Sequence, residues 1–343
     1  MEIAEAVDRR IRRAVEQRDF SGVVHLRRGA EVLCARAYGA AQRAEGILNR
    51  VDTRFGIASG TKSFTAVAVI RLIERGRLGL ESRLRDLLGS AVAPLDRRVT
   101  VGQLLTHSSG VADYADENVP GFDYESLWRE RPVYRMRTLG DWMPLLQGGM
   151  KFAPGERFEY CNSGYILLGL VIETVAGEDF CTHVQREVFD PAGMRASGFF
   201  EADRLPAGTA LGYIPLPEEG GHRTNVFSIP ARGGPDGGAY ATAPDLARFI
   251  DALRSHHLAG EGMTRELLRP HIRIDETGRG YGYGFWFGRT AQGGVRMSMI
   301  GSDPGAECSS SFYPERDLQL TLLTNLDGGL GDLRGEIEEL LFG

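Results

Sequence analysis

The chain has 343 residues, of which 42% are hydrophobic and 25% are charged, as is usual for globular proteins. That length exceeds one typical core and predicts two domains, or one large domain with an insertion. The net charge of −6 is small and the basic residues are scattered among acids, which argues against a nucleic-acid-binding surface.

The start of the chain, "MEIAEAVDRRIRRAVEQRDF", has the pattern of a charged amphipathic helix and lacks the apolar core of a signal peptide. No apolar run is long enough to span a membrane. The four cysteines are widely spaced, with no CxxC pair, so we expect free thiols, no metal and no cofactor. These features predict a cytoplasmic protein, with an uncleaved export route left open.

The next segments predict two strands and a helix. "SGVVHLRRGAEVLCARAYGAA" reads as two strands joined by a turn at Gly29 and Ala30. A helix is then predicted to open at Ser59, because "FTAVAVIRLIERGRL" carries apolar residues at helical spacing, and to end near Gly76.

Residues 80–230 are richer in helical patterns and loops, and "DYADENVPGFDYESLW" predicts a long loop. The acids of this loop and its flanks favour an ordinary solvated surface. The alternative is that the loop covers a pocket and selects cationic or amine-bearing substrates. These acids are Asp113, Asp116, Glu117, Asp123 and Glu125.

The C-terminal part predicts more sheet. "PARGGPDGGAYATAPDLARFIDAL" is a Gly/Pro-rich hinge running into a helix that starts near Thr242 or Asp245. Short runs of β-forming residues follow, separated by turns, and predict an antiparallel meander. A last amphipathic helix is predicted from about Asp332 to Phe342. The simplest architecture is a sheet from both ends of the chain with a mostly helical middle.

One pair of residues carries a chemical signal. Only Lys62 and Lys151 are lysines among the 40 Lys and Arg residues, and Lys62 stands three positions after Ser59. On a helix the two side chains share a face. An arginine cannot give up its proton, whereas a lysine can, so the choice of lysine at position 62 indicates a need for a neutral amine.

The flanks of this pair resemble the serine β-lactamase and penicillin-binding-protein-like hydrolases, especially the class C and family VIII esterase branch. "FGIASGTKSFTAVAVIRLIERGRLGLESRL" is similar to the nucleophile helix of that family, and "VTVGQLLTHSSGV" to its next segment. "FAPGERFEYCNSGYILLGLVIE" resembles the Tyr-x-Asn motif, at Tyr160 and Asn162. The resemblance runs from about residue 20 to the C-terminus.

The resemblance implies an α/β, β-lactamase/transpeptidase-like fold: an antiparallel sheet flanked by helices from both chain ends, with a mostly helical inserted domain. We expect residues 1–79 and 231–343 to form the first domain and residues 80–230 the second, with the active site in the cleft between them.

The resemblance also implies an acyl-enzyme mechanism. Ser59 attacks an acyl carbon, Lys62 and Tyr160 share the role of base, and Asn162 orients the substrate or Lys62. The sequence leaves open which of the pair is the base. Cys161 is expected only to pack, and His107 to hold a loop together.

The third family motif departs from its usual pattern. An ungapped comparison anchored on Pro304 and Gly305 puts Met299 where the family has Lys or His, Ile300 at the small position and Gly301 at the glycine. An alternative with a deletion puts Ser302 at the Lys/His position. Either way the cation is missing.

Several substrate contacts follow from this segment. The backbone N–H groups of Ser59 and Ser302 are expected to form an oxyanion hole, with Gly301, Ser302 and Asp303 among the substrate-binding residues. Asp303 and Glu307 flank this strand. Arg296 would replace the missing cation only if it reached the pocket, and an exposed position at the start of the strand is favoured.

These features predict a serine hydrolase acting on a small ester, amide or peptide, with weak or absent β-lactamase activity and no nucleic-acid or membrane partner. A D-amino-acid amidase or peptidase, an acyltransferase, and a decayed ligand-binding module on the same fold are the alternatives. The substrate and the oligomeric state are left open.

Overall fold

The computed structural model describes residues 2–17, 20–129 and 131–343. Met1, Arg18 and Asp19, at the ends of the predicted N-terminal helix, lie outside the described residues. None of the helices in the described part of the chain combines the length and hydrophobicity that a bilayer crossing requires.

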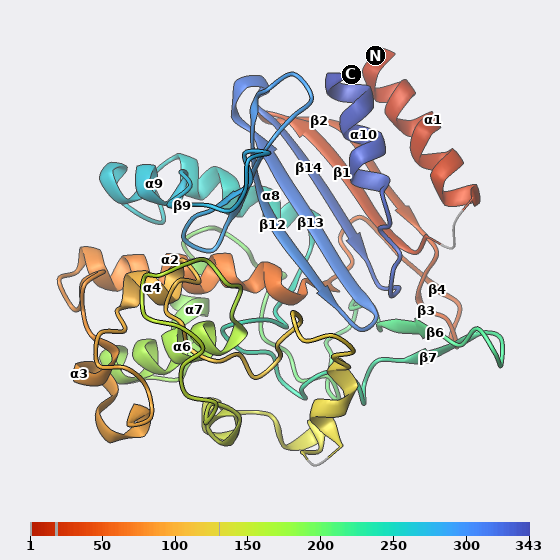
Figure 1. Ribbon diagram of the computed structural model, residues 1–343. Coiled ribbons are helices and arrows are strands. Elements are labelled where there is room, and N and C mark those ends of the chain that lie inside the picture. The colour runs from red at the N-terminus through yellow and green to blue at the C-terminus, as the bar shows by residue number, and fades with distance from the viewer. Residues whose placement is uncertain (1, 18–19, 130) are drawn as a thin grey trace.

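An antiparallel sheet of eight strands forms the upper part of the molecule in Figure 1. In spatial order its strands are β2 (Glu31–Tyr38), β1 (Gly22–Arg28), β14 (Leu318–Thr324), β13 (Ala306–Tyr313), β12 (Val295–Asp303), β11 (Trp286–Arg289), β10 (Gly280–Tyr281) and β9 (Ile272–Arg273). The predicted N-terminal hairpin and C-terminal meander are both confirmed. They join where β1 pairs with β14, Gly22 opposite Thr324.

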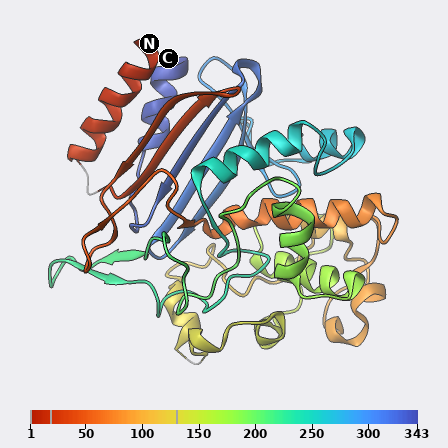
Figure 2. The same ribbon diagram turned by 180° about the vertical axis from the view of Figure 1, so that it is seen from behind.

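Three helices cover the two faces of the sheet. Helices α1 (Glu2–Gln17) and α10 (Leu333–Phe342) lie together on one face, and α8 (Ala243–Arg254) crosses the opposite face, as the view from behind shows (Figures 1 and 2). Helix α8 begins as predicted, because the Thr242 hydroxyl accepts a hydrogen bond from the Asp245 N–H at 3.1 Å.

The remaining helices lie below the sheet. They are α2 (Lys62–Glu74), α3 (Leu84–Leu88), α4 (Val101–Leu105), α5 (Leu139–Trp142), α6 (Asn162–Ala176) and α7 (Phe180–Val184). Helix α9 (Glu261–Leu267) instead lies beside the sheet (Figure 1). Short pairs of strands complete the fold: β3 (Ala40–Gln42) with β4 (Ile47–Leu48), β5 (Phe55–Gly56) with β8 (Tyr240–Ala241), and β6 (Tyr213–Pro215) with β7 (His222–Thr224).

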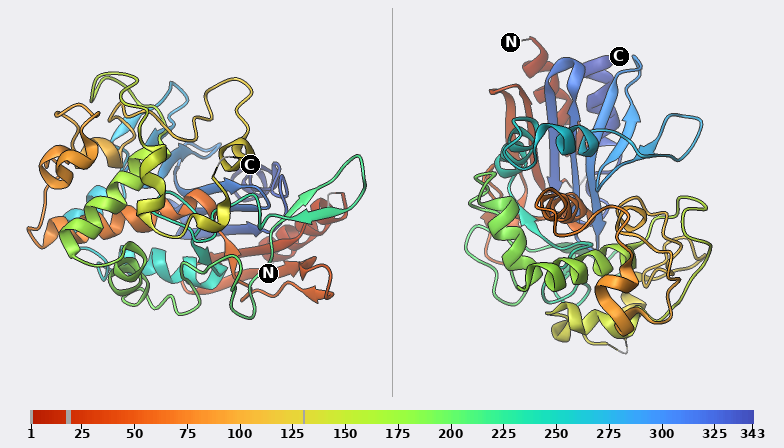
Figure 3. Two further views of the ribbon diagram at one scale, coloured as in Figure 1. Left: turned by 90° about the horizontal axis from the view of Figure 1, so that it is seen from below. Right: turned by 90° about the vertical axis from the view of Figure 1, so that its left-hand side faces the viewer.

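Helix α2 is the central element. It is buried on nearly all sides, as expected for a helix that is apolar all round. The right-hand view of Figure 3 shows it almost end-on, between the sheet and the other helices. Phe64 packs edge-on against Phe189 and Phe249, with ring centroids 4.9 and 4.8 Å apart. One of two hydrophobic clusters therefore joins the sheet to the helical part, and the other lies between the sheet and helices α1 and α10.

We propose the boundaries that the sequence suggests, residues 1–79 with 231–343 against residues 80–230, as the division of the fold. Two features support this proposal. Every strand of the large sheet comes from the first part, and α3 to α7 come from the second.

Candidate active site

A tight turn presents Ser59 between the sheet and α2. The helix predicted to open at Ser59 is present, but its first turn is a 3-10 turn, η1 (Ala58–Thr61), and the α-helix α2 begins at Lys62. The turn starts at Ala58, whose φ of 46° lies in the left-handed region that non-glycine residues rarely adopt. Such strain persists only where the surroundings impose it, and it is common at functional sites.

The surroundings of this turn are hydrogen-bonded. The Thr61 hydroxyl donates to the Ala58 carbonyl at 2.7 Å and accepts the Ala239 N–H at 3.0 Å. The Gly238 N–H donates to the Ala58 carbonyl at 3.3 Å. The hinge before α8 therefore clamps the turn that carries the serine.

Lys62 lies beneath Ser59 and is 1% exposed. Its Nζ is 3.0 Å from Ser59 Oγ, 2.8 Å from Asn162 Oδ1 and 2.5 Å from the main-chain oxygen of Asp236. These three contacts match the three hydrogens of an ammonium group. In a neutral amine, two N–H groups can stay on Asn162 and Asp236 while the lone pair faces the serine hydroxyl.

Tyr160 reaches the same place from the segment before α6. The Lys62 Nζ is 4.9 Å from the centroid of its ring, which stacks on Trp286 at 5.8 Å. Burial raises the pKa of Tyr160 well above its ordinary value, and a hydrogen bond with Ser59 lowers it only in part. The neutral phenol is therefore its stable form.

Asn162 is the first residue of α6, and Asp113 holds its amide. Asn162 Nδ2 donates to Asp113 Oδ2 at 3.1 Å, and the Ser163 N–H donates to Oδ1 at 2.9 Å. These bonds turn the amide oxygen of Asn162 towards Lys62. Burial raises the pKa of Asp113 to about 6.

Two residues beside this motif have structural roles. His107 Nδ1 accepts a hydrogen bond from the Cys161 N–H at 3.0 Å, which fits the expected role of holding a loop. Burial lowers the pKa of His107 well below its ordinary value. The expectation that Cys161 only packs is incomplete, because its sulfur also accepts the Gly164 N–H at 3.3 Å and caps α6.

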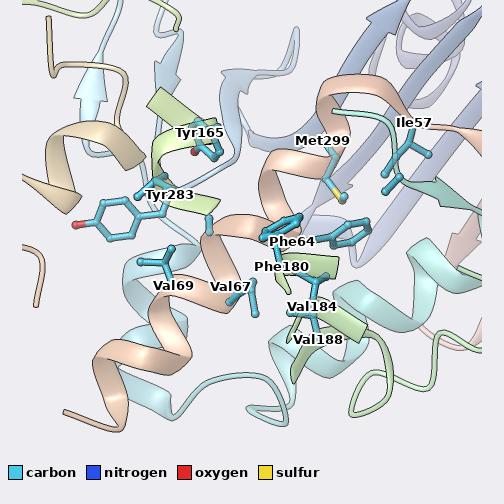
Figure 4. Packing of buried hydrophobic residues seen from close by; sticks show 14 of the residues in the cluster. Ile57, Phe64, Val67, Val69, Tyr165, Phe180, Val184, Val188, Tyr283 and Met299 are labelled. Atoms are coloured by element: carbon cyan, nitrogen blue, oxygen red, sulfur yellow. The ribbon is translucent and has the colours of Figure 1, made fainter. Parts of the chain in front are cut away.

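Strand β12 passes directly behind the nucleophile turn. A Cβ built on Gly301 would lie 2.7 Å from Ser59 N and 2.2 Å from Ile57 O, so only glycine allows this approach. This contact favours the ungapped comparison, which puts Gly301 at the glycine of the third motif. Met299, 1% exposed, packs in the core beside Phe64 and Ile57 (Figure 4).

A pocket in front of Ser59 encloses about 850 Å³, including its part open to solvent. Its walls include Ser59, Tyr114, Glu117, Tyr124, Trp142, Asn162, Phe200, Asp236, Tyr240 and Asp303. No lysine or arginine of the described residues lines it. Arg296 is instead bound to Glu338 of α10 at 2.7 Å.

The predicted site residues thus occupy different positions around the pocket. Ser59, Asn162 and Asp303 line it, whereas Lys62, Tyr160 and Gly301 are not among its lining residues. The side chain of Ser302 is exposed and also lies outside the lining. Glu307 accepts the N–H groups of Gly328 and Leu330 and so supports a loop.

Residues that the sequence did not single out complete the site. The main-chain carbonyl of Asp236 accepts a hydrogen bond from Lys62, and its carboxylate accepts one from the Tyr114 hydroxyl at 2.5 Å. Burial raises the pKa of Asp236, and burial together with the Asp236 charge raises that of Asp303 to about 7. Within the described residues, no group of three His, Cys, Asp or Glu side chains is arranged to hold a metal ion.

The sequence matches the Beta-lactamase family over residues 7–341. It is 32% identical over 327 residues to esterase EstB of Burkholderia gladioli, covering 85% of this chain and 78% of that protein. It is 25% identical over 338 residues to a D-aminopeptidase of Brucella anthropi, covering 94% and 59%.

A solved structure has the same fold. A penicillin binding protein from Bacillus halodurans superposes with a TM-score of 0.90 at 43% identity, covering 96% of this chain and 99% of that one. The fold class predicted from the sequence is thereby confirmed.

Proposed function

This chain belongs to the beta-lactamase family of serine hydrolases, as its motifs predicted, and we propose that it cleaves a small ester or amide through an acyl-enzyme on Ser59. One observation carries the proposal: a buried lysine amine lies 3.0 Å from the serine hydroxyl, with its other two contacts fixed. A serine hydroxyl needs such a partner, because it is a weak nucleophile until its proton is taken.

In the proposed reaction, Lys62 accepts the Ser59 proton as Oγ bonds to the acyl carbon. The resulting ammonium donates to Asn162 Oδ1 and the Asp236 carbonyl, which are already in place. Tyr160, as a neutral phenol, passes a proton to the departing group and recovers one from Lys62. Water then attacks the carbonyl of the acyl-Ser59 ester while the same groups transfer the protons in the reverse direction, which releases the acid and restores Ser59.

Backbone N–H groups of Ser59 and Ser302 are the proposed donors to the oxyanion. The lack of room for a Cβ at Gly301 supports this assignment, because it shows that the backbone of β12 lies against the nucleophile turn. Donors of this kind need no particular side chain.

We propose weak or absent β-lactamase activity. A penicillin carries a carboxylate, and the described lining of the pocket offers it carboxylates instead of a cation. Loss of one charge-assisted contact costs about 1.5–3 kcal/mol, or roughly ten- to a hundredfold in affinity. Turnover of nitrocefin as fast as that of p-nitrophenyl acetate would contradict this proposal.

Hydrolysis of p-nitrophenyl acetate by the purified protein and its Ser59→Ala variant tests the main proposal. We expect activity to vanish in Ser59→Ala and to persist in Ser90→Ala, which removes an exposed hydroxyl away from the pocket. Mass spectrometry of the quenched reaction should find one acetyl group on the peptide containing Ser59.

Equal background rates in all three proteins would favour the decayed ligand-binding module. Release of p-nitrophenol that accelerates when an alcohol or amine is added, with acetyl transfer to it, would identify an acyltransferase. Both outcomes use the same assay.

A further inference from the structure

Most acids around the pocket have partners. Of the five acids in the loop before α5, Asp113 binds Asn162, Asp116 binds Lys151 at 2.8 Å, and two more are paired with arginines: Asp123 with Arg129 and Glu125 with Arg223. Glu117 is the exception. Among the described residues its carboxylate has no hydrogen bond or ion pair, and it lines the pocket.

The strand behind Ser59 leaves a second carboxylate in the same condition. Glu307 is bonded to two backbone N–H groups, whereas the Asp303 carboxylate has no hydrogen bond or ion pair to a described residue. Asp303 lines the pocket two residues after Gly301, and its Oδ2 lies 3.8 Å from a Cβ built on Gly237. An unpaired, partly buried carboxylate is costly, and a bound cation would lower this cost.

An independent observation comes from the aromatic wall. Tyr240 is 8% exposed and lines the pocket, yet its hydroxyl has no hydrogen-bond partner among the described residues. It lies close enough to Asp303 for the carboxylate charge to raise its pKa, which burial brings to about 12. Tyr124 also lines the pocket. Burial raises the pKa of its hydroxyl, and the charges of Asp303, Asp236 and Glu117 raise it further.

Aromatic faces and unpaired carboxylates in one pocket have a common ligand chemistry. Organic ammonium groups bind over Tyr and Trp rings through cation–π attraction and bind carboxylates through charge. The described wall contains no competing Lys or Arg, and Lys62 behind it is engaged by Ser59, Asn162 and Asp236.

We propose that this pocket selects substrates carrying an ammonium group, held between the carboxylates of Asp303 and Glu117 and the aromatic wall that includes Tyr240. This inference rests on the proposed hydrolase function. Asp303 and Glu117 are then the residues that determine specificity. The pocket would prefer cationic substrates, whereas a pocket built for a substrate carboxylate prefers anionic ones.

A pair of esters equal in shape tests the proposal. The p-nitrophenyl ester of 4-(trimethylammonio)butanoate carries a fixed positive charge, and that of 5,5-dimethylhexanoate replaces the nitrogen by carbon. We expect kcat/KM to be roughly ten- to a hundredfold higher for the cationic ester. The ratio should fall about tenfold in Asp303→Asn and in Glu117→Gln. The Glu218→Gln control removes an exposed carboxylate outside the pocket and should leave the ratio unchanged.

Binding to the Ser59→Ala protein separates this inference from the hydrolase function. Calorimetry should find choline bound at least tenfold more tightly than its neutral isostere, 3,3-dimethylbutan-1-ol. If neither ester is cleaved but choline is preferred, the hydrolase proposal fails and the ammonium site stands. Equal binding of the two alcohols, or a faster neutral ester, would overturn the ammonium site.

Discussion

Three neutral oxygens converge on the amine of Lys62, and they explain why this position holds one of the two lysines in an arginine-rich chain. The serine hydroxyl, the Asn162 amide and the Asp236 carbonyl each occupy one direction around Nζ. A guanidinium would keep the charge but cannot accept a proton.

We therefore expect Lys62→Arg to lower kcat for p-nitrophenyl acetate by about 10²–10⁴, the usual contribution of general base catalysis. Lys151→Arg is the matched control, because Lys151 only pairs with Asp116 and Glu159 at the surface and should keep its activity. Circular dichroism would verify that both variants fold. Full activity in Lys62→Arg would rule out Lys62 as the base.

Asp113 is a positioning residue, since it touches Asn162 and not the reacting atoms. In Asp113→Asn the new amide can place its NH2 group, a donor, opposite the Nδ2 donor of Asn162. The Asn162 side chain is then no longer held and can turn its oxygen away from Lys62. We expect kcat to fall about tenfold or more with little change in KM, and the acidic limb of the pH–rate profile to shift. Asp123→Asn, in the same loop, should change kcat less than twofold.

The sequence identified some of these residues and missed others for a physical reason. Ser59, Lys62, Tyr160 and Asn162 stand in motifs with fixed spacing. Asp113 belongs to no such motif, and the sequence alone does not distinguish it from the acids of a solvated surface. Asp236 acts on Lys62 through its carbonyl, which every residue has, so its identity gives no signal.

Among the elements, the contact between β12 and the nucleophile turn is the closest. Gly301→Ala would push a methyl group against backbone atoms of Ile57 and Ser59, which cannot rotate away. We expect at least a hundredfold loss of kcat and a loss of unfolding free energy of about 1–3 kcal/mol, as for an overpacked core. Both can be measured by ester turnover and urea unfolding.

Gly262→Ala is the control for this variant. Gly262 lies in α9 with nothing within 4 Å of an added Cβ, so alanine should stabilise the helix by about 0.5–1 kcal/mol and leave activity intact. If Gly301→Ala behaved like Gly262→Ala, the close approach of strand and turn would have no role in catalysis.

At the level of elements, periodicity and turn residues predicted most of the structure. The hairpin of β1 and β2, the C-terminal meander, and the start of α8 at Thr242 all follow local patterns. The 3-10 turn at Ser59 does not, because Ala58 takes its left-handed conformation from tertiary contacts, the pairing of β5 with β8 and the clamp by Gly238.

For the molecule as a whole, the pocket carries a cost in stability. The folded-state pKa of Asp303 is raised to about 7, above the ordinary value of 3.8. The folded state therefore favours the protonated form of Asp303. Its contribution to the unfolding free energy is complete below about pH 4 and is lost as the pH rises through 7. Asp303→Asn has no such dependence.

We expect the unfolding free energy of Asp303→Asn to exceed that of the natural protein by about 1–3 kcal/mol at pH 8.5, with the gain shrinking towards pH 4. Thermal unfolding at a series of pH values measures this difference. A gain that is constant with pH, or that grows as the pH falls, would show that Asp303 is not an uncompensated carboxylate.

The shape and charge of the pocket are also properties of the whole molecule. Its walls come from the loop before α5, the segment before α8 and the end of β12, which are far apart in the chain. The sequence suggested an amine-selective loop as a minor alternative, but it did not show which acids are paired. Only the folded arrangement separates Glu117 and Asp303 from their neighbours.

The pairing of β1 with β14 also governs how the chain matures during synthesis. The hairpin of β1 and β2 is synthesised about 280 residues before the strand that completes it, Leu318–Thr324. At roughly 5–20 residues per second, the hairpin waits on the order of tens of seconds with an open edge. Exposed edges favour wrong pairing, so we expect nascent chains of this protein to depend on chaperones that shield β-strands until Leu318–Thr324 is available.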